Sequence, residues 1–129
     1  MDLRSLTAVS AIDGRYRKQV QHLDEYFSEY ALMKYRVLVE VEYLLFLANK
    51  RIFKLSANAA EKLAQIRDNF SIENAQQIKQ IEKVTNHDVK AVEYFIKNEL
   101  DTIAESNVKE WVHFGLTSQD INNTSIPLS

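Results

Sequence analysis

Apolar residues recur at steps of three and four along the middle of the chain, which is the period of one face of an α-helix. From Leu23 onward, one such face comprises Leu23, Phe27, Tyr30, Met33, Val37, Val41, Leu44 and Ala48. A second apolar set, on another side of the same stretch, comprises Leu32, Tyr35, Val39, Tyr43 and Phe46. The pattern predicts one helix of about 25 residues, roughly 40 Å long. Because this helix is apolar on two sides, we expect it to be covered twice, by another helix of this chain or by a partner subunit.

Serine residues mark the starts of two shorter helices. Ser56 stands before residues 57–68, where apolar side chains fall at helical spacing, and Ser71 precedes another such stretch. Serine is a preferred N-cap because its hydroxyl accepts a hydrogen bond from a free backbone N–H of the first turn. The sequence therefore predicts a helix over 57–68 and another that begins after Ser71.

Two further helix starts lie near the end of the chain. Residues 107–110 have the form of a capping box, and Gly115 predicts the end of the helix that follows. Residues 117–123 have the chemistry of another helix start, but we expect no apolar face to bury before the chain ends. A helix this short is marginal alone. Two interpretations remain open, a frayed C-terminal tail or a longer protein cut at this point.

The first segment, Met1 to about Gln19, has no clear hydrophobic period and contains the turn signal Asp13-Gly14. We expect an extended arm there. Arg15 and Tyr16 in this arm combine a phenol with a guanidinium, a group suited to bidentate binding of phosphate or carboxylate. From the residues alone, an ordinary surface arginine beside a packed tyrosine is the stronger interpretation.

The composition narrows the fold class to all-α. The chain has 129 residues, of which 46% are hydrophobic and 26% charged, values typical of one globular domain. It contains only two glycines and one proline. Because sandwiches and barrels need frequent glycine and proline turns, this scarcity favours long helices.

Charge and residue types argue against several partners. Sixteen Lys and Arg residues and eighteen Asp and Glu residues are interspersed, so we predict no surface for nucleic acid. The longest apolar run, Tyr43–Ala48, is too short to span a membrane. The chain has no cysteine, and neither His22 nor His113 has metal-ligand spacing, so we expect no metal site. We expect His113 to be a packed or capping histidine. These features are compatible with a cytoplasmic protein.

The spacing of Thr85 and Asp88 predicts a helix start that could carry chemistry. The Thr-x-x-Asp pattern places Asn86 and His87 in the first helical turn. Free backbone N–H groups and the helix dipole favour an anion at such a place. His87 adds a ring nitrogen for a phosphate, a carboxylate or a proton in transfer.

Thr117 and Asp120 repeat this pattern and put Ser118 and Gln119 in the equivalent position. Two polar helix starts in one small domain could together hold a dianion. Capping sequences, however, occur at most helices and satisfy backbone donors. The residues alone therefore favour ordinary caps over an anion site.

Four strings of the sequence, taken together, resemble one known family. They are residues 5–16 (SLTAVSAIDGRY), 27–30 (FSEY), 85–94 (TNHDVKAVEY) and 113–123 (HFGLTSQDINN). In this order they resemble the adenylosuccinate lyases of the fumarase/aspartase superfamily, and the resemblance covers essentially the whole chain. Within that superfamily, the DGRY and TNHDVKAVE strings point to the purine enzymes.

The resemblance implies an activity and a set of substrate-binding residues. Members of the family cleave adenylosuccinate to AMP and fumarate by a β-elimination that needs no cofactor or metal. They release fumarate in the same way from the succinyl-aminoimidazole-carboxamide ribotide of purine biosynthesis. By analogy, the residues that bind the nucleotide substrate are Arg15, Tyr16, Asn86, His87, Asp88, Thr117 and Ser118.

The resemblance also implies a role for each part of this set. Arg15 and Tyr16 would hold the nucleotide at its phosphate, and Thr117 and Ser118 would grip the succinyl or fumarate carboxylates. His87 would either orient the substrate or assist proton transfer, and the two roles stay open.

The resemblance further implies a domain arrangement and its consequences. Residues 1–116 correspond to the N-terminal helical domain of a homotetramer, and residues 117–129 to the start of the first helix of its central bundle. The family's serine-base loop, roughly Ser-Ser-x-Met-Pro-x-Lys-x-Asn-Pro, and its general-acid histidine have no match here. We therefore expect this chain alone to be inactive. The alternatives are another fumarate-releasing lyase, such as an argininosuccinate lyase, and a non-catalytic helical interaction module.

Overall fold

The structure is a computed structural model that describes residues 5–103, 105 and 107–129. Within these residues every regular element is helical, which confirms the all-α prediction. The first four residues of the predicted arm lie outside the described part of the chain. No helix in the described ranges is long and apolar enough to cross a membrane.

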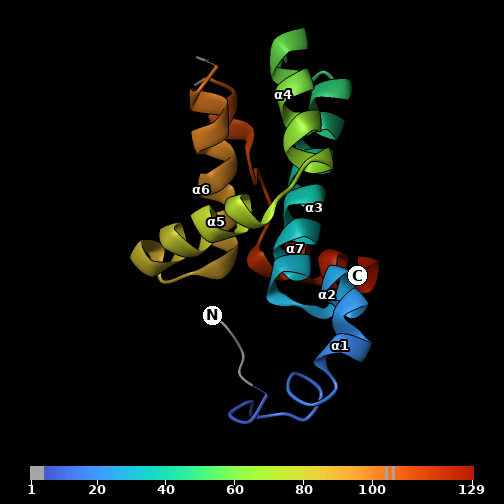
Figure 1. Cartoon of the computed structure of the whole chain (residues 1–129). Helices are drawn as coiled ribbons and strands as arrows, with labels where there is room; N and C mark the ends of the chain where they lie inside the picture. The colour runs from blue at the N-terminus through green and yellow to red at the C-terminus, as the bar shows by residue number, and fades with distance from the viewer. Residues whose placement is uncertain (1–4, 104, 106) are drawn as a thin grey trace.

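One long helix organises the fold (Figure 1). It is α3, and it contacts α4, α5, α6 and α7 in turn. Figure 1 shows α4 beside the upper half of α3, α5 and α6 packed on each other at one side, and α7 at its lower end. The elements are α1 (Arg17–Val20), the 3₁₀ helix η1 (Gln21–Leu23), α2 (Asp24–Phe27), α3 (Glu29–Asn49), α4 (Ala57–Asp68), α5 (Ile72–Thr85), α6 (Asp88–Asp101), the 3₁₀ helix η2 (Val108–Trp111) and α7 (Ser118–Leu128).

The core lies where α3, α4, α5 and α6 meet, and it is built from aliphatic side chains at helical spacing. These side chains bury their apolar surface, which is the main favourable term in folding. The fully buried members include Val37, Val41, Leu44, Leu63, Ile78, Val92, Ile96 and Leu100. The predicted starts at Ser56 and Ser71 are confirmed, because each hydroxyl accepts a hydrogen bond from the backbone N–H three residues on.

The predicted helix from Leu23 is interrupted at Ser28, so α3 begins only at Glu29. Ser28 has extended backbone angles, and its hydroxyl accepts a hydrogen bond from the N–H of Ala31 at 3.1 Å. A serine that caps the helix after it cannot continue the helix before it. As a result, Leu23 and Phe27 leave the buried face and are 37% and 78% exposed.

The second apolar side of α3 is covered in part by α7. Tyr43 and Val39 are half-buried, whereas Phe46 is exposed. Ile121 and Ser125 of α7 are fully buried, so the expectation that this last helix has no face to bury is wrong. These two side chains are buried because α7 lies directly against α3.

The N-terminal segment is turned rather than extended. The N–H groups of Gly14 and Tyr16 both donate to the carbonyl of Ala11, at 3.3 Å and 3.0 Å. Gly14 is buried, and a Cβ at this position would lie 2.8 Å from the carbonyl oxygen of Ser5. The turn signal at Asp13-Gly14 is therefore confirmed, and the extended arm is wrong. We refer to residues 5–16 as the arm.

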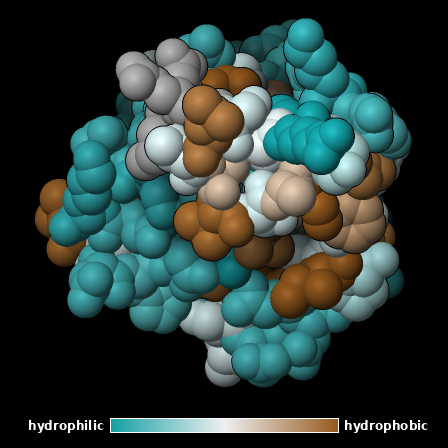
Figure 2. Space-filling view, turned by 60° about the horizontal axis from the view of Figure 1, so that its bottom comes forward, coloured by the Kyte–Doolittle hydropathy of each residue, from teal (hydrophilic) through white to brown (hydrophobic). Residues whose placement is uncertain are grey.

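The arm exposes apolar side chains. Leu6, Val9 and Ile12 are all exposed, and so is Phe27 in the neighbouring α2. Figure 2 looks onto this lower end of the molecule and shows hydrophobic residues between hydrophilic ones.

The predicted helix after Asn107 is a short 3₁₀ segment, η2. Asn107 itself has helical backbone angles and makes no side-chain cap bond, so its capping box does not form. This segment already ends at Trp111, where Val112 has extended backbone angles, so the prediction that Gly115 ends it is wrong. Gly115 has a φ of +73°, a conformation that glycine adopts without strain, and it lies in the turn before α7.

Candidate functional site

The start of α6 differs from its prediction by two residues. Helix α5 continues through Thr85, and Asn86 closes it with a φ of +53°. His87 is then the N-cap of α6, and Asp88 is its first residue. Thr85 is therefore not the cap, and Asn86 and His87 do not lie in the first turn. Asparagine tolerates the left-handed conformation better than most residues, so the chain can turn at Asn86 from α5 into α6.

The His87 ring caps α6 and faces the next helix start. Its Nδ1 accepts a hydrogen bond from the backbone N–H of Lys90 at 3.1 Å. A nitrogen that accepts in this way carries no proton, so the neutral ring has its hydrogen on Nε2. Nε2 lies 3.3 Å from the hydroxyl oxygen of Ser118, while the side chain remains 49% exposed. His87 thus presents an N–H donor at the surface between α6 and α7.

The start of α7 is a complete capping box. The hydroxyl of Thr117 accepts from the N–H of Asp120 at 3.3 Å, and the Asp120 carboxylate accepts from the N–H of Thr117 at 2.8 Å. Hydrogen bonds from the Thr117 backbone and hydroxyl lower the pKa of Asp120 below its ordinary range. The predicted cap at Thr117 is confirmed, and it leaves the Ser118 hydroxyl pointing toward His87.

A buried arginine of α3 joins the two helix starts. Arg36 is 7% exposed. Its Nε donates to the side-chain oxygen of Asn122 in α7 at 3.0 Å, and a terminal nitrogen lies 2.9 Å from the carboxylate of Asp88 in α6. We refer to residues 86–88, 117, 118 and 122 together with Arg36 as the α6–α7 junction.

Asp88 stays ionised in this setting. Burial acts to raise its pKa, but the N–H of Val89 and the nearby guanidinium of Arg36 outweigh burial and lower it below the ordinary 3.8. The junction therefore holds a fixed carboxylate, a fixed guanidinium and a neutral imidazole side by side.

A second polar pair is buried behind the junction. Glu40, one turn after Arg36, is 1% exposed, and its carboxylate contacts Nδ1 of His113 at 2.5 Å. Burial raises the pKa of Glu40, and the neighbouring His113 opposes this shift only in part. The side chain of His113 is 14% exposed, so the expected packed histidine is confirmed, with Glu40 as its partner.

Arg15 and Tyr16 lie apart from the junction. Within the described residues neither side chain makes a hydrogen bond or ion pair with α6 or α7, and Arg15 lies over the Tyr16 ring, 5.6 Å from its centroid. Tyr16 is 43% exposed, so the packed tyrosine expected from the residues alone is not found.

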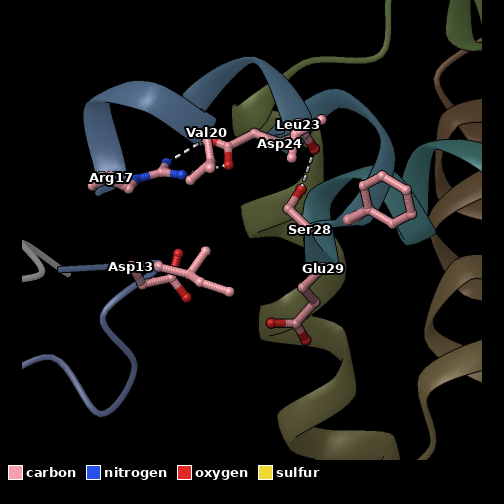
Figure 3. A pocket seen from close by; sticks show the side chains of 9 residues that line it. Asp13, Arg17, Val20, Leu23, Asp24, Ser28 and Glu29 are labelled. Carbon is pink, nitrogen blue, oxygen red and sulfur yellow. Dashed lines mark hydrogen bonds and ion pairs between the residues drawn. The ribbon is translucent and has the colours of Figure 1, made fainter. Parts of the chain in front are cut away.

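The neighbouring Arg17, in contrast, forms an ion pair with Asp24. It donates to Asp24 at 2.6 Å, beside an open pocket that Asp13, Val20, Leu23 and Ser28 also line (Figure 3). Of the predicted site residues, the structure thus gathers Asn86, His87, Asp88, Thr117 and Ser118, and leaves Arg15 and Tyr16 outside.

Sequence reasoning missed Arg36, Glu40 and Asn122. A signal was present, because Arg36 and Glu40 stand one turn apart directly beside the buried positions Val37 and Val41. Charges at such positions are rarely buried unless they are paired. Their partners lie 52 to 86 positions away in the chain, too far for spacing rules to find.

Comparison with known proteins identifies the family to which the chain belongs. Residues 14–129 match the family described as Lyase. The match covers the junction, the buried pair and α3, and the chain belongs to this lyase family.

Curated relatives carry a more specific name. The chain is 57% identical to an adenylosuccinate lyase of Dictyostelium discoideum over all of its own length and 29% of that protein. It is 51% identical to an adenylosuccinate lyase of Escherichia coli K12, over 97% of this chain and 28% of that protein. For the Haemophilus influenzae adenylosuccinate lyase the identity is 47% over the same shares. The chain thus spans less than a third of the length of these relatives.

Proposed function

We propose that this chain supplies part of the substrate site of an adenylosuccinate lyase. The reaction is the β-elimination of fumarate from adenylosuccinate, giving AMP, and from the succinyl-aminoimidazole-carboxamide ribotide of purine biosynthesis. The observation that carries the proposal is the meeting of two polar helix starts, with Nε2 of His87 3.3 Å from the hydroxyl of Ser118. The names of the relatives supply the substrate.

The proposed roles follow from the chemistry of the reaction. Removal of a proton beside a carboxylate builds negative charge on that carboxylate in the transition state. Donors fixed in advance near this charge lower the barrier, because they need not reorganise as the charge forms. The hydroxyls of Thr117 and Ser118 and the first N–H groups of α7 are such donors, and they would hold the succinyl carboxylates.

His87 is proposed as a donor rather than a base. Its Nδ1 is occupied by the N–H of Lys90, which leaves Nε2–H to donate to the substrate. Asn86 and Asp88 would line the same site from either side of His87. Arg15 and Tyr16 would bind the nucleotide phosphate, which requires the arm to approach a junction from another part of the assembly.

The remaining machinery lies outside these 129 residues in this proposal. The serine base and the general-acid histidine would come from other segments, residues 1–116 would form the N-terminal helical domain, and residues 117–129 would begin the first helix of a central bundle. We propose a cytoplasmic homotetramer that uses no cofactor. The chain alone is then expected to release no fumarate.

The test replaces the matching first segment of the Escherichia coli adenylosuccinate lyase with this chain and measures fumarate release from adenylosuccinate. The key variant is His87→Asn, because asparagine is also a good N-cap and preserves the start of α6. Loss of the Nε2–H donor is expected to lower kcat/KM on the order of 10²-fold.

Ser56→Ala is the matched control, because it removes a cap of α4 far from the junction. It is expected to leave kcat/KM unchanged. A folded chimera that releases no fumarate, or one in which His87→Asn behaves like Ser56→Ala, contradicts the proposed function. Release of fumarate from argininosuccinate instead would assign the chain to another lyase.

A further inference from the structure

Arg36 is a buried charge that contacts both helices of the junction. Its guanidinium contacts Asn122 of α7 and Asp88 of α6, and Figure 1 shows both of these helices beside α3. Only 8% of its side chain is exposed, whereas the side chain of its partner Asp88 is 49% exposed. The buried arginine of α3 therefore has one partner at the start of α6, Asp88, and one a turn into α7, Asn122.

The two partners of Arg36 are tied to His87 and Ser118 by the covalent chain. Asp88 directly follows His87 in sequence, and Asn122 lies four residues after Ser118 on α7. Residues four apart in a helix lie on the same side, one turn apart. The guanidinium is planar and rigid, so two nitrogens of one group fix the distance between the two helix starts.

Both helices also pack on α3, but polar contacts between the two starts are few in the described part of the chain. The direct hydrogen bond between α6 and α7 is the His87–Ser118 contact, which at 3.3 Å is long and lies in an exposed place. Long, solvent-exposed hydrogen bonds contribute little. The buried Arg36 contacts, at 3.0 Å and 2.9 Å, are shorter and charge-assisted.

We propose that Arg36 is a positioning residue that sets the distance between His87 and Ser118. In this way it places the donors of the junction that would bind the substrate carboxylates. This inference rests on the proposed function for its catalytic consequence, although the distance itself can be measured without turnover. Arg36 does not touch substrate, and it acts through Asp88 and Asn122.

The first experiment uses the 129-residue chain and follows the nuclear Overhauser effect between the His87 ring and the Ser118 β-protons. Arg36→Met keeps a long apolar side chain but removes the guanidinium and with it the contacts to Asp88 and Asn122. It is expected to abolish this signal while the amide contacts within α6 and α7 persist. Arg36→Lys keeps one charge without the planar fork and is expected to weaken the signal.

Arg67→Met is the matched control, because Arg67 also holds two carboxylates, those of Glu42 and Asp68, away from the junction. It is expected to leave the His87–Ser118 signal intact. Asn122→Ala tests the same link without burying a new side chain and is expected to behave like Arg36→Met. A signal that keeps the intensity of the parent chain in both Asn122→Ala and Arg36→Lys overturns the proposal, whatever the folding of Arg36→Met.

The second experiment measures steady-state kinetics of the chimera. Loss of folded enzyme lowers the apparent kcat and leaves KM unchanged. Displacement of the donors that would bind the substrate carboxylates raises KM. We expect Arg36→Met to raise KM for adenylosuccinate, and the inhibition constant of fumarate, on the order of tenfold. Arg36→Lys is expected to recover part of this loss, and Arg67→Met to show none.

The two hypotheses fail in different ways. If His87→Asn impairs the chimera but Arg36→Met leaves KM unchanged, the positioning role is wrong and the proposed function stands. If Arg36→Met separates His87 from Ser118 but neither variant affects fumarate release, the proposed function is wrong and with it the catalytic meaning of the Arg36 contacts.

Discussion

The α6–α7 junction and the arm carry the two halves of the predicted site, and the fold treats them differently. In the junction, Arg36 is buried and bonded to two other helices. In the arm, Arg15 lies over the ring of the adjacent Tyr16. Both regions contain polar residues of the kind that bind anions, but only the junction is built before any ligand arrives.

The difference follows from how much apolar surface each region buries. Helix α7 is held against α3 by Ile121, and α6 contributes Val92, Ile96 and Leu100 to the core. The arm buries little more than Gly14, and its larger apolar side chains are exposed. Side chains that bind a ligand rigidly need packed side chains beneath them. The junction has this support within one chain, whereas the arm would gain it only by packing against another surface.

The largest expected effect comes from removing the packing beneath the junction. Ile121→Ala deletes a side chain that is 1% exposed between α7 and α3. Truncation of a buried isoleucine to alanine costs about 2–5 kcal/mol. Urea unfolding followed by circular dichroism should show this loss in the free energy of unfolding.

Ile126→Ala is the matched control in the same helix, because Ile126 is 58% exposed. We expect it to change the free energy of unfolding by less than about 0.5 kcal/mol. Equal effects of the two substitutions would mean that α7 is not docked on α3, and the contrast between junction and arm would disappear.

Local capping chemistry was predictable from the sequence at three of the five predicted helix starts. Ser56, Ser71 and Thr117 begin their helices as their hydroxyls predict. Thr85 fails because its pattern fits equally well at the end of one helix and the start of the next. The left-handed Asn86 decides between them, and it moves the cap to His87.

The start of α3 was predicted too early, because the apolar period runs through Ser28 without a break and hides the N-cap that this serine forms. Long-range contacts were not predictable from spacing at all. Arg36 finds its partners in α6 and α7, at distances along the chain that no spacing rule covers. Most of the polar residues that meet at the junction were therefore singled out from the sequence, whereas Arg36, which contacts both helices, became visible only in the fold.

A smaller effect separates the carboxylates of the two regions by pH. Glu40, buried behind the junction, has a pKa above its ordinary 4.5 because burial disfavours its charge. Asp24, beside the arm, has a pKa below its ordinary 3.8 because Arg17 donates hydrogen bonds to it. Raised and lowered values have opposite consequences for stability.

The sign for Glu40 is that its neutral form favours the folded state. Its contribution is fully present below pH 4.5 and is lost as the pH rises through its higher folded pKa. The glutamine in Glu40→Gln cannot ionise. As the pH rises above 4.5, the parent chain should therefore lose stability relative to this variant, and the difference between their free energies of unfolding should grow in favour of the variant. The gain is about 1.4 kcal/mol for each unit by which folding raises the pKa.

The measurement is urea unfolding of both chains from pH 4 to neutrality, with Asp24→Asn as the comparison. The contribution of Asp24 has the opposite sign, since it is present above pH 3.8 and is lost as the pH falls through the lower folded pKa. A parent chain and Glu40→Gln that keep a constant difference across this range would show that Glu40 is not held in a dry environment.

The smallest expected effect concerns the charge pair beside the arm. Arg17 and Asp24 form an ion pair in which the side chains are 36% and 40% exposed, next to the pocket of Figure 3. Exposed pairs are screened by water and salt and pay the entropy of ordering two side chains. Arg17→Met should therefore leave the urea midpoint unchanged within error, at low and at high salt. A clear loss that disappears at high salt would contradict this expectation. It would mean that the pair holds α1 and α2 against the capped start of α3. The segment next to the arm would then be more rigid than its exposed side chains indicate.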